Sequence, residues 1–223
     1  MKYPVLACDY DGTLVSGRLI SNEVQKALSR LKKAGRKLIL VTGRELDSLL
    51  DDFSRVDLFD RIVVENGGVL YNPGAGTVKL LASPPSEEFA VALKDLKIDP
   101  LSIGSVIVST RIPHDVIVQN VIQEQGLDLD IIYNKDSVMI LPAGIDKFTG
   151  LLAALDEFGL NPESVIGVGD AENDISFLSG CGYSVAVANA IAQVKMRADL
   201  ILAEPNGAGI IELVETLMDD DPV

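Results

Sequence analysis

The sequence predicts an α/β protein with a doubly wound, Rossmann-like parallel sheet and a small α+β domain inserted into it. Short apolar segments alternate with helical segments in both halves of the chain, which is typical of parallel sheets covered by helices. Between the halves this alternation stops, and proline-containing stretches mark both of its limits. We therefore expect one core formed by both ends of the chain and one inserted domain.

The first half predicts two strand–helix units and then a third strand. Its strands are short apolar runs, as expected for buried parallel strands. The first helix has an apolar stripe that includes Val24, Leu28 and Leu31. Ser21 can be its N-cap, and Gly35 follows as its stop. The expected strands are residues 3–8, 37–41 and 61–64, with a short apolar segment at 69–71, and the expected helices are residues 21–34 and 45–53.

The second half resumes the alternation after residue 143. Glycine ends its first helix, and short apolar runs again indicate buried strands. The acidic tail at residues 219–221 is expected to fray. The expected helices are residues 146–158, 173–178 and 210–217, and the expected strands are residues 164–168, 184–187 and 200–202.

Two linkers, at residues 83–86 and 142–144, enclose the predicted insert. The division is therefore a core of residues 1–82 and 143–223 with an inserted domain of residues 83–142. Two of its strands follow each other closely, which indicates antiparallel neighbours. Its expected elements are helices at 87–96 and 113–125 and strands at 105–110, 129–133 and 137–141.

Composition narrows the class of function. The 223 residues are 48% hydrophobic and carry a net charge of −14, which argues against nucleic acid and anionic membrane surfaces as partners. An acidic protein that binds phosphate needs a bound cation or local basic groups. No apolar run is long enough to span a bilayer and Asp9 and Asp11 interrupt the opening apolar run, so we expect a cytoplasmic protein. Cys8 and Cys181 are expected to be buried thiols.

The first candidate site is the segment Asp9-Tyr10-Asp11-Gly12-Thr13. A carboxylate that ends a strand can act as a nucleophile, and carboxylates form phosphorylated intermediates in known phosphoryl transfers. A second carboxylate two residues later, Asp11, can act as general acid and then base. Gly12 allows a tight turn whose amides face a phosphate. An ordinary Asp-Gly turn explains this segment equally well when it is taken alone.

Two further segments offer groups for a phosphate. Thr42 and the amide of Gly43 follow the second strand and can bind phosphate oxygens, although an N-cap role for Thr42 is favoured when it is considered alone. Arg44 is interpreted as a surface or interdomain residue. Lys147 opens the helix after the insert, where its charge can offset those of the nucleophile and the phosphate; its alternative is a solvated helix lysine.

The fourth segment supplies acids after a late strand. Asp170 ends the strand, and Asp174 lies one helical turn further on. Mg²⁺ prefers octahedral oxygen ligands, so Asp9, the backbone carbonyl of Asp11 and Asp170 form a partial ligand set, with Asp174 as a fourth or supporting group. Glu172 is expected to point away. Each acid alone is explained by helix capping or by a first-turn position.

Together, these four segments resemble the motifs of the haloacid dehalogenase (HAD) superfamily. Asp9-x-Asp11-Gly12-Thr13 is similar to its first motif, Thr42 to its second, Lys147 to its third and Gly169-Asp170-x-x-Asn173-Asp174 to its fourth. An insert between the second and third motifs implies a C2-type cap. The segment Val64-Glu65-Asn66-Gly67-Gly68 and a cap of about sixty residues resemble the Cof-like branch and the archaeal-type phosphoglycolate phosphatases.

The resemblance implies a Mg²⁺-dependent phosphatase that acts on a small phosphomonoester, of the phosphoglycolate or sugar phosphate class. Asp9 would be phosphorylated, Asp11 would serve as acid and base, and Thr42, Gly43, Lys147 and Asn173 would hold the phosphate. The alternatives are a phosphomutase-type phosphotransferase and a non-enzymatic phosphate-binding module. The protein would be a monomer or homodimer.

Three polar residues of the insert are candidates for contacting the organic part of the substrate. Arg111 suits a carboxylate because its guanidinium makes paired contacts, but a structural salt bridge is equally plausible. His114 is better explained as a solvated residue in the first turn of a helix. Lys135 is the third candidate.

Overall fold

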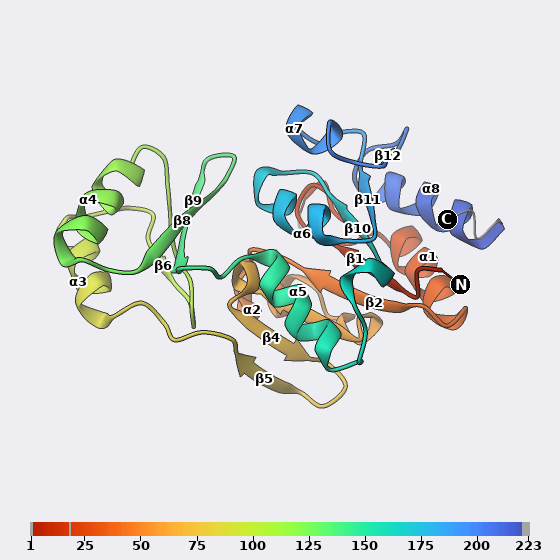
Figure 1. The fold of residues 1–223 in the computed structure, drawn as a ribbon, viewed down its shortest axis with the longest axis horizontal. Helices are drawn as coiled ribbons and strands as arrows, with labels where there is room; N and C mark the ends of the chain where they lie inside the picture. The colour runs from red at the N-terminus through yellow and green to blue at the C-terminus, as the bar shows by residue number, and fades with distance from the viewer. Residues whose placement is uncertain (1, 18, 220–223) are drawn as a thin grey trace.

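The computed structural model describes residues 2–17 and 19–219. Its main sheet has eight strands in the order β12-β11-β10-β1-β2-β3-β4-β5, and neighbouring strands pair parallel except at β3–β4 and β4–β5, so that only β4 runs in the opposite direction. The core therefore has the parallel, doubly wound sheet that the alternating pattern predicted (Figure 1). The strands are β1 (Val5–Cys8), β2 (Lys37–Val41), β3 (Arg61–Val64), β4 (Val69–Asn72), β5 (Thr77–Leu80), β10 (Val165–Gly169), β11 (Tyr183–Ala186) and β12 (Leu200–Ile201).

Helices cover both faces of this sheet. From β1 the chain steps to β2 on one side, whereas from β10 it steps to β11 on the other side. Because such crossovers are right-handed, the two steps place their helices on opposite faces. The helices of the core are α1 (Asn22–Lys33), α2 (Leu46–Asp52), α5 (Lys147–Asp156), α6 (Ile175–Gly180), α7 (Ala192–Lys195) and α8 (Asn206–Asp219), and its 3₁₀ turns are η1 (Val56–Leu58), η2 (Glu65–Gly67), η3 (Pro162–Ser164) and η4 (Glu172–Asp174).

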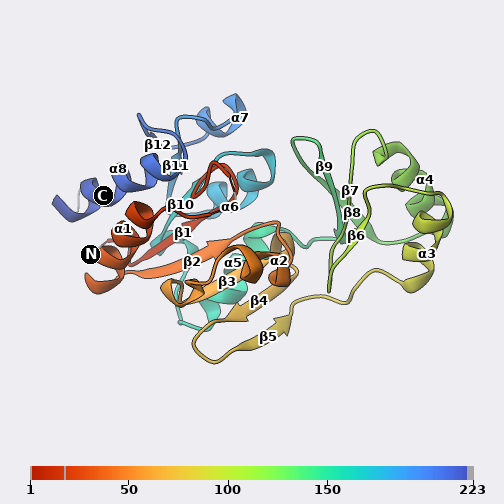
Figure 2. The ribbon, with the colours of Figure 1, turned by 180° about the vertical axis from the view of Figure 1, so that it is seen from behind.

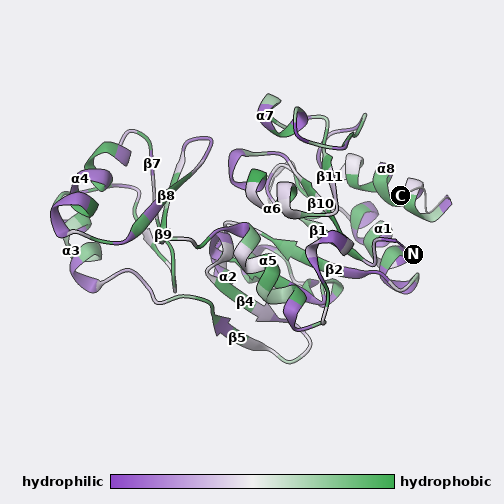
Figure 3. Cartoon of the chain, in the orientation of Figure 1, coloured by the Kyte–Doolittle hydropathy of each residue, from purple (hydrophilic) through white to green (hydrophobic). Residues whose placement is uncertain are grey.

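Helix α1 illustrates how the sequence specifies these elements. The side chain of Ser21 accepts a hydrogen bond from the amide of Val24 at 3.3 Å, as an N-cap should. Val24, Leu28 and Leu31 are buried along one face. The opposite face is polar, and this division between apolar and polar residues is visible in Figure 3. The apolar stripe therefore determines which side of α1 packs against β2 and α8.

The order of the strands also determines where a ligand can bind. Strand β1 lies between β2, which follows it in the chain, and β10, which comes after the insert. In open α/β sheets, a ligand binds beyond the carboxyl ends of strands at the point where the order of connection reverses. Here that point lies between β1 and β10, whose next residues are Asp9 and Asp170.

A second sheet lies outside the core and has the order β6-β7-β9-β8, with all of its pairs antiparallel. Helices α3 and α4 pack against each other and share a separate hydrophobic cluster with this sheet, which includes Phe89 and Ile140. We call this unit the cap. Figure 2 shows it beside the core, joined by the segments that follow β5 and β9. Its elements are α3 (Glu87–Asp95), β6 (Ser102–Ile103), β7 (Val108–Arg111), α4 (Asp115–Gln125), β8 (Leu129–Asn134) and β9 (Ser137–Pro142).

The structure confirms the predicted fold class, but several details differ. Strands β5 and β6 and helix α7 were not predicted, and α8 begins four residues before the expected start at residue 210. In the acidic tail, Asp219 is the last residue of α8, and residues 220 and 221 lie outside the described residues. Within the described part of the chain, no helix has the length and apolar character required to cross a membrane.

Candidate active site

Asp9 stands at the center of the candidate site, directly after β1. Its amide donates to the carbonyl oxygen of Val168 at 2.9 Å, which continues the pairing of β1 with β10. The residue is only 4% exposed. Its Oδ1 accepts from Nζ of Lys147 at 2.5 Å, whereas the buried Oδ2 has no hydrogen-bond partner among the described residues. A buried carboxylate oxygen without a partner is costly, so Oδ2 of Asp9 is the atom most in need of a ligand.

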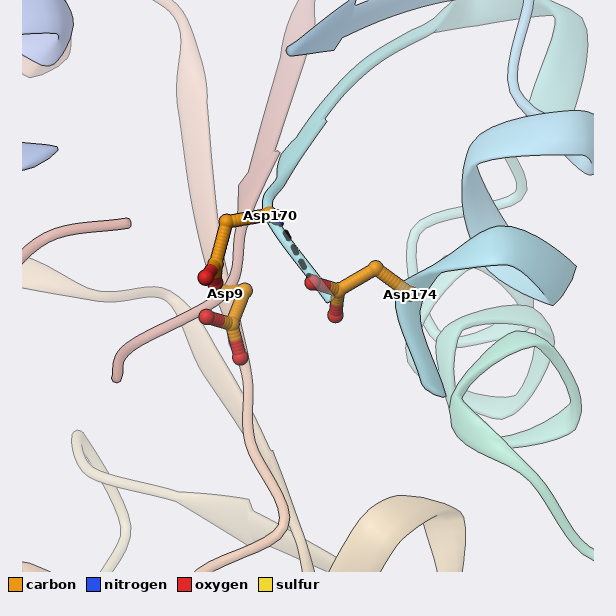
Figure 4. A group of neighbouring side chains, drawn as sticks. All are labelled: Asp9, Asp170 and Asp174. Atoms are coloured by element: carbon orange, nitrogen blue, oxygen red, sulfur yellow. Dashed lines mark hydrogen bonds between the residues drawn. The ribbon is translucent and has the colours of Figure 1, made fainter. Parts of the chain in front are cut away.

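Two more carboxylates lie beside Asp9, as Figure 4 shows. Asp170 follows β10, and its Oδ1 accepts from the hydroxyl of Thr13 at 3.3 Å. Oδ2 of Asp174 accepts from the amides of Asp170 and Ala171 at 2.8 and 2.9 Å. Asp174 therefore fixes the backbone that carries Asp170.

Lys147 connects two of these acids. Its side chain is completely buried, and Nζ donates to Asp9 at 2.5 Å and to Asp174 at 2.6 Å. Asp146 and Thr149 form a capping box at the start of α5, which fixes the turn from which Lys147 projects. The lysine is therefore not the solvated helix residue of the alternative interpretation.

The three carboxylates fit a divalent cation. Each of Asp9, Asp170 and Asp174 offers an oxygen, and these oxygens lie within 4.8 Å of one another. The three carboxylates face two ammonium groups, the buried one of Lys147 and the largely exposed one of Lys135, and all of the available ligand atoms are oxygens. Such a set suits Mg²⁺ better than a thiophilic metal. The side chain of Asp11 is not part of this group.

The acids also shift one another's protonation. Burial raises the pKa of Asp9 well above its ordinary value; the charge of Asp174 adds to this effect and Lys147 opposes it. Burial and Asp174 likewise raise the pKa of Asp170, against the influence of Lys135. Burial alone would lower the pKa of Lys147, but Asp174 and Asp9 together raise it. The lysine therefore stays charged, and a bound cation would relieve the crowding of the carboxylates.

Asp11 has a partner that the sequence analysis did not expect. Nη2 and Nε of Arg44 donate to its two carboxylate oxygens, each at 2.7 Å. Nη1 of the same guanidinium bonds Asp52 at 2.6 Å, and the group lies over the ring of Tyr10. The interpretation of Arg44 as a surface or interdomain residue was therefore wrong, because the side chain folds back into the site from the turn after β2.

The turn that carries Asp11 is packed tightly against Asp170. Gly12 has a φ of +90°, and a Cβ atom at this position would collide with the Asp170 carboxylate. The carbonyl of Gly12 accepts from Nδ2 of Asn189 at 2.8 Å. Glycine is therefore required here by both backbone conformation and space.

The groups expected to hold a phosphate lie beside this cluster. Thr42 is buried, and its hydroxyl accepts from the amide of Arg44 at 3.2 Å. Nδ2 of Asn173 donates to Oδ1 of Asn66 at 2.9 Å, whereas Oδ1 of Asn173 is buried without a partner among the described residues. A Cβ placed on Gly43 would lie 3.8 Å from Nδ2 of Asn173. Thr42 and Gly43 follow β2, the neighbour of β1 in the sheet, and Gly43 lies close to Asn173. We call these three residues the catalytic floor.

The cap reaches this site through the turn between β8 and β9. Nζ of Lys135 bonds Oδ2 of Asp170 at 3.1 Å, and its amide donates to Glu172 at 3.3 Å. Glu172, which was expected to point away, therefore faces the cap. His114, which was expected to be a solvated residue in the first turn of a helix, is instead the partly buried N-cap residue of α4, and its Nε2 lies 3.1 Å from the carbonyl oxygen of Asp99.

A cavity of about 700 Å³ lies between the core and the cap. Arg111 lines this cavity. Among the described residues, no carboxylate forms an ion pair with it. The lining includes Asp11, Ser16, Asn189 and Asn206 from the core and Arg111 and Lys135 from the cap.

Known proteins resemble this chain over nearly its whole length. The sequence pattern of the haloacid dehalogenase-like hydrolases matches residues 6–97 and 95–214. A phosphoglycolate phosphatase of Methanothermobacter thermautotrophicus is 27% identical over 221 residues, covering 96% of this chain and 98% of that protein. Phosphoglycolate phosphatase 2 of Saccharolobus solfataricus is 30% identical, covering 96% of this chain and 92% of its own length.

Solved structures share the whole fold. A Thermoplasma acidophilum protein superposes with a TM-score of 0.82 at 20% identity, covering 98% of this chain and 99% of its own. A sugar phosphatase of HAD subclass IIB has a TM-score of 0.75 at 19% identity, with 96% of this chain and 98% of that chain covered. Core and cap thus occur together in these proteins.

Proposed function

This chain belongs to the haloacid dehalogenase-like hydrolases and is a phosphoric monoester hydrolase, and we propose that it cleaves a small phosphomonoester through an aspartyl-phosphate on Asp9. One observation supports this mechanism most directly. Oδ1 of Asp9 is held by Lys147, while Oδ2 is buried without a partner among the described residues. A nucleophile must keep one oxygen available while the rest of its carboxylate is fixed in direction.

In the first step, an oxygen of Asp9 attacks phosphorus and the bond from phosphorus to the ester oxygen breaks. Asp11 gives its proton to the departing alkoxide, which leaves as an alcohol. Thr42, the amide of Gly43 and Asn173 would hold the nonreacting phosphate oxygens. Lys147 offsets negative charge on the nucleophile and the phosphoryl group, so that two anions can approach each other.

In the second step, Asp11 takes a proton from water, and the resulting hydroxide attacks phosphorus. The bond from Asp9 to phosphorus then breaks, which releases inorganic phosphate and restores the carboxylate. The carboxylates of Asp9, Asp170 and Asp174 would hold the Mg²⁺ ion, with the backbone carbonyl of Asp11 as a further candidate ligand. When bound, the ion supplies positive charge that stabilises the phosphoryl group during transfer.

2-Phosphoglycolate is the substrate we propose. Two relatives that match nearly the whole chain are phosphoglycolate phosphatases. Arg111 and Lys135 line the cavity between cap and core, where a guanidinium suits a small carboxylate. Sugar phosphates are the competing class, because a sugar phosphatase shares the fold.

A set of phosphate esters tests the substrate class. Purified protein with Mg²⁺ should release phosphate from 2-phosphoglycolate with a higher kcat/KM than from hexose phosphates or 4-nitrophenyl phosphate. Preference for a hexose phosphate would contradict the proposed substrate but not the phosphatase activity. Retention of the phosphoryl group on a sugar acceptor, without phosphate release, would indicate a phosphotransferase.

The role of Asp9 is tested by Asp9→Asn, which keeps the shape of the side chain but removes the nucleophilic oxygen. We expect phosphate release to fall below detection for every ester. Asp47→Asn is the matched control because it makes the same change at an exposed acid in the first turn of α2. Substantial turnover by Asp9→Asn would refute a phosphorylated Asp9.

A further inference from the structure

Glu65 is a buried acid that the proposed mechanism does not use. It follows β3 at the start of η2 and is only 2% exposed. Its Oε1 accepts from the amide of Ser105 at 2.9 Å, and its Oε2 accepts from the amides of Val106 and Ile107 at 2.6 and 2.9 Å. No lysine or arginine in the described part of the chain pairs with it. Three backbone amides of the cap therefore compensate a carboxylate of the core.

The segment of the cap that binds Glu65 also packs into the apolar core. Val106 is fully buried and belongs to the hydrophobic cluster of the core rather than to that of the cap. A Cβ on Gly68 would lie 2.8 Å from side-chain atoms of Val106, so this side chain packs directly against the backbone of Gly68. Glu65 and Val106 thus join the two units through both charge and packing.

The turn that carries Glu65 is also tied to the catalytic floor. The amide of Glu65 donates to the carbonyl of Arg44 at 2.8 Å, and the amide of Asn66 donates to that of Thr42 at 3.0 Å. Oδ1 of Asn66 accepts from Asn173 at 2.9 Å. Glu65 and Asn66 both have a φ of +52°, a conformation that non-glycine residues keep only when their surroundings impose it. The turn that binds the cap through Glu65 is therefore hydrogen-bonded to Thr42 and Asn173, which are proposed to hold the phosphate.

A second contact between core and cap, made by the side chain of Lys135, is more open to solvent. Lys135 bonds Asp170 through one hydrogen bond, and its side chain is 58% exposed. The largely exposed ammonium of Lys135 can exchange its single bond to the buried Asp170 for bonds to water, whereas the buried carboxylate of Glu65 would lose three charge-assisted hydrogen bonds. If the cap moves, the Lys135 contact should break first and the Glu65 contact last.

We propose that Glu65 is the fixed pivot of the cap, a positioning residue that sets how the cap closes over the substrate. The turn between β8 and β9, which carries Lys135, is then the edge that opens. This role rests on the proposed phosphatase function, since the closed cap is needed only to enclose the organic part of the ester.

Glu65→Gln tests the pivot because it keeps the size of the side chain but places an amide donor against the backbone donors. We expect the amides of Ser105, Val106 and Ile107 to exchange hydrogen at least tenfold faster. KM for 2-phosphoglycolate should rise at least tenfold, whereas kcat for 4-nitrophenyl phosphate should stay within about twofold. A residue with a merely structural role would reduce the turnover of both esters together.

Glu45→Gln is the matched control, since Glu45 accepts from the hydroxyl of Ser102 in an exposed contact between core and cap. It should change neither exchange nor KM. If Glu65→Gln fails to fold, Gly104→Ala replaces it, because a Cβ there would lie 2.9 Å from the Glu65 carboxylate and push the amides away. Unchanged exchange in these amides, or equal kinetic losses for both esters, would overturn the pivot.

The two proposals fail in different ways. A wild-type protein without phosphatase activity would refute the proposed function, while faster amide exchange in Glu65→Gln alone would still support the attachment of the cap at Glu65. An active wild type whose Ser105–Ile107 amides are unaffected by Glu65→Gln would refute the pivot and leave the phosphatase intact.

Discussion

Arg44 both orders and restrains the proposed general acid. Both oxygens of Asp11 accept from its guanidinium at 2.7 Å. This pairing fixes the direction of the carboxylate, but a carboxylate with two such contacts must release one oxygen before it can transfer a proton. Arg44 also bonds Asp52, which keeps the guanidinium in place when that contact loosens. Arg44 should therefore affect the protonation of the leaving group more than attack by Asp9.

Arg44→Ala tests this effect through the leaving group. We expect kcat for an alkyl phosphate to fall about 10- to 100-fold, less than most of the ~10²–10⁴ that general acid catalysis usually contributes, because Asp11 itself remains. The loss for 4-nitrophenyl phosphate should be several-fold smaller, because nitrophenolate leaves without a proton. Steady-state kinetics with both esters measure the difference. Arg55→Ala, which removes an exposed arginine paired with Asp57 outside the site, serves as the control. Equal losses for the two esters would contradict a role in protonation.

The two cysteines are predicted to be unreactive in the folded protein. Both are free thiols. Burial raises the pKa of Cys181 to about 12, and burial with the charge of Asp9 raises that of Cys8. Because the thiolate is the reactive form, both should resist iodoacetamide at pH 8. Mass spectrometry should find no label on the native protein and two labels after denaturation. Rapid labelling of either native thiol would refute this prediction.

At the scale of residues, the sequence predicted what lies at strand ends and missed what depends on distant partners. Asp9, Thr42 and Asp170 were recognised because each follows an apolar run that had to be a buried strand. The pairing of Arg44 with Asp11 joins residues 33 apart, and that of Lys135 with Asp170 joins residues 35 apart. Neither spacing corresponds to a local element. Such contacts exist only once the sheet has formed and the cap is placed.

At the scale of elements, the turn after β1 is the segment with the least freedom. Gly12→Ala places a Cβ against the Asp170 carboxylate at a φ of +90°, and the backbone conformation alone costs on the order of 1–3 kcal/mol. We expect a lower melting temperature and a loss of Mg²⁺ affinity, because Asp170 must move. Calorimetry measures both. Gly76→Ala is the control: Gly76 also has a positive φ but has open space around it, so it should lower stability without affecting Mg²⁺ binding.

Elements were predicted well where burial imposes a pattern. The central parallel strands lie within a few residues of their expected positions, because a short, continuous apolar run must be buried and a central strand of a parallel sheet is buried on both faces. Strand β5 was missed because all four of its residues are exposed, and β6 because it has only two residues, both exposed. The early start of α8 was missed because Gly207 disfavours a helix. That glycine allows α8 to lie close to Leu14 and Val24.

At the scale of the whole molecule, four of the 19 lysines and arginines lie together at the candidate site. The chain has a net charge of −14, yet Arg44, Lys147, Arg111 and Lys135 all lie at the site or its cavity. The sequence analysis required a bound cation or local basic groups, and the fold brings basic groups from both core and cap. Which lysines and arginines would converge was not evident from the sequence, because Arg111 and Lys135 approach the core only through the cap.

A divalent ion bound at Asp9, Asp170 and Asp174 would compete with Lys135 for the carboxylate of Asp170. Its Nζ bonds Oδ2 of Asp170 at 3.1 Å, so removing this ammonium should make the carboxylate more available. The ammonium of Lys135 is 58% exposed although Asp170 is buried, so we assign the pair about 1 kcal/mol, the upper end of the range for exposed pairs, and 1.4 kcal/mol corresponds to a tenfold change. We therefore expect Lys135→Ala to bind Mg²⁺ up to about fivefold more tightly by calorimetry. Lys26→Ala, which removes the same charge from the exposed face of α1, corrects for net charge. Weaker or unchanged Mg²⁺ affinity relative to this control would mean that Lys135 assists the metal site rather than competing with it.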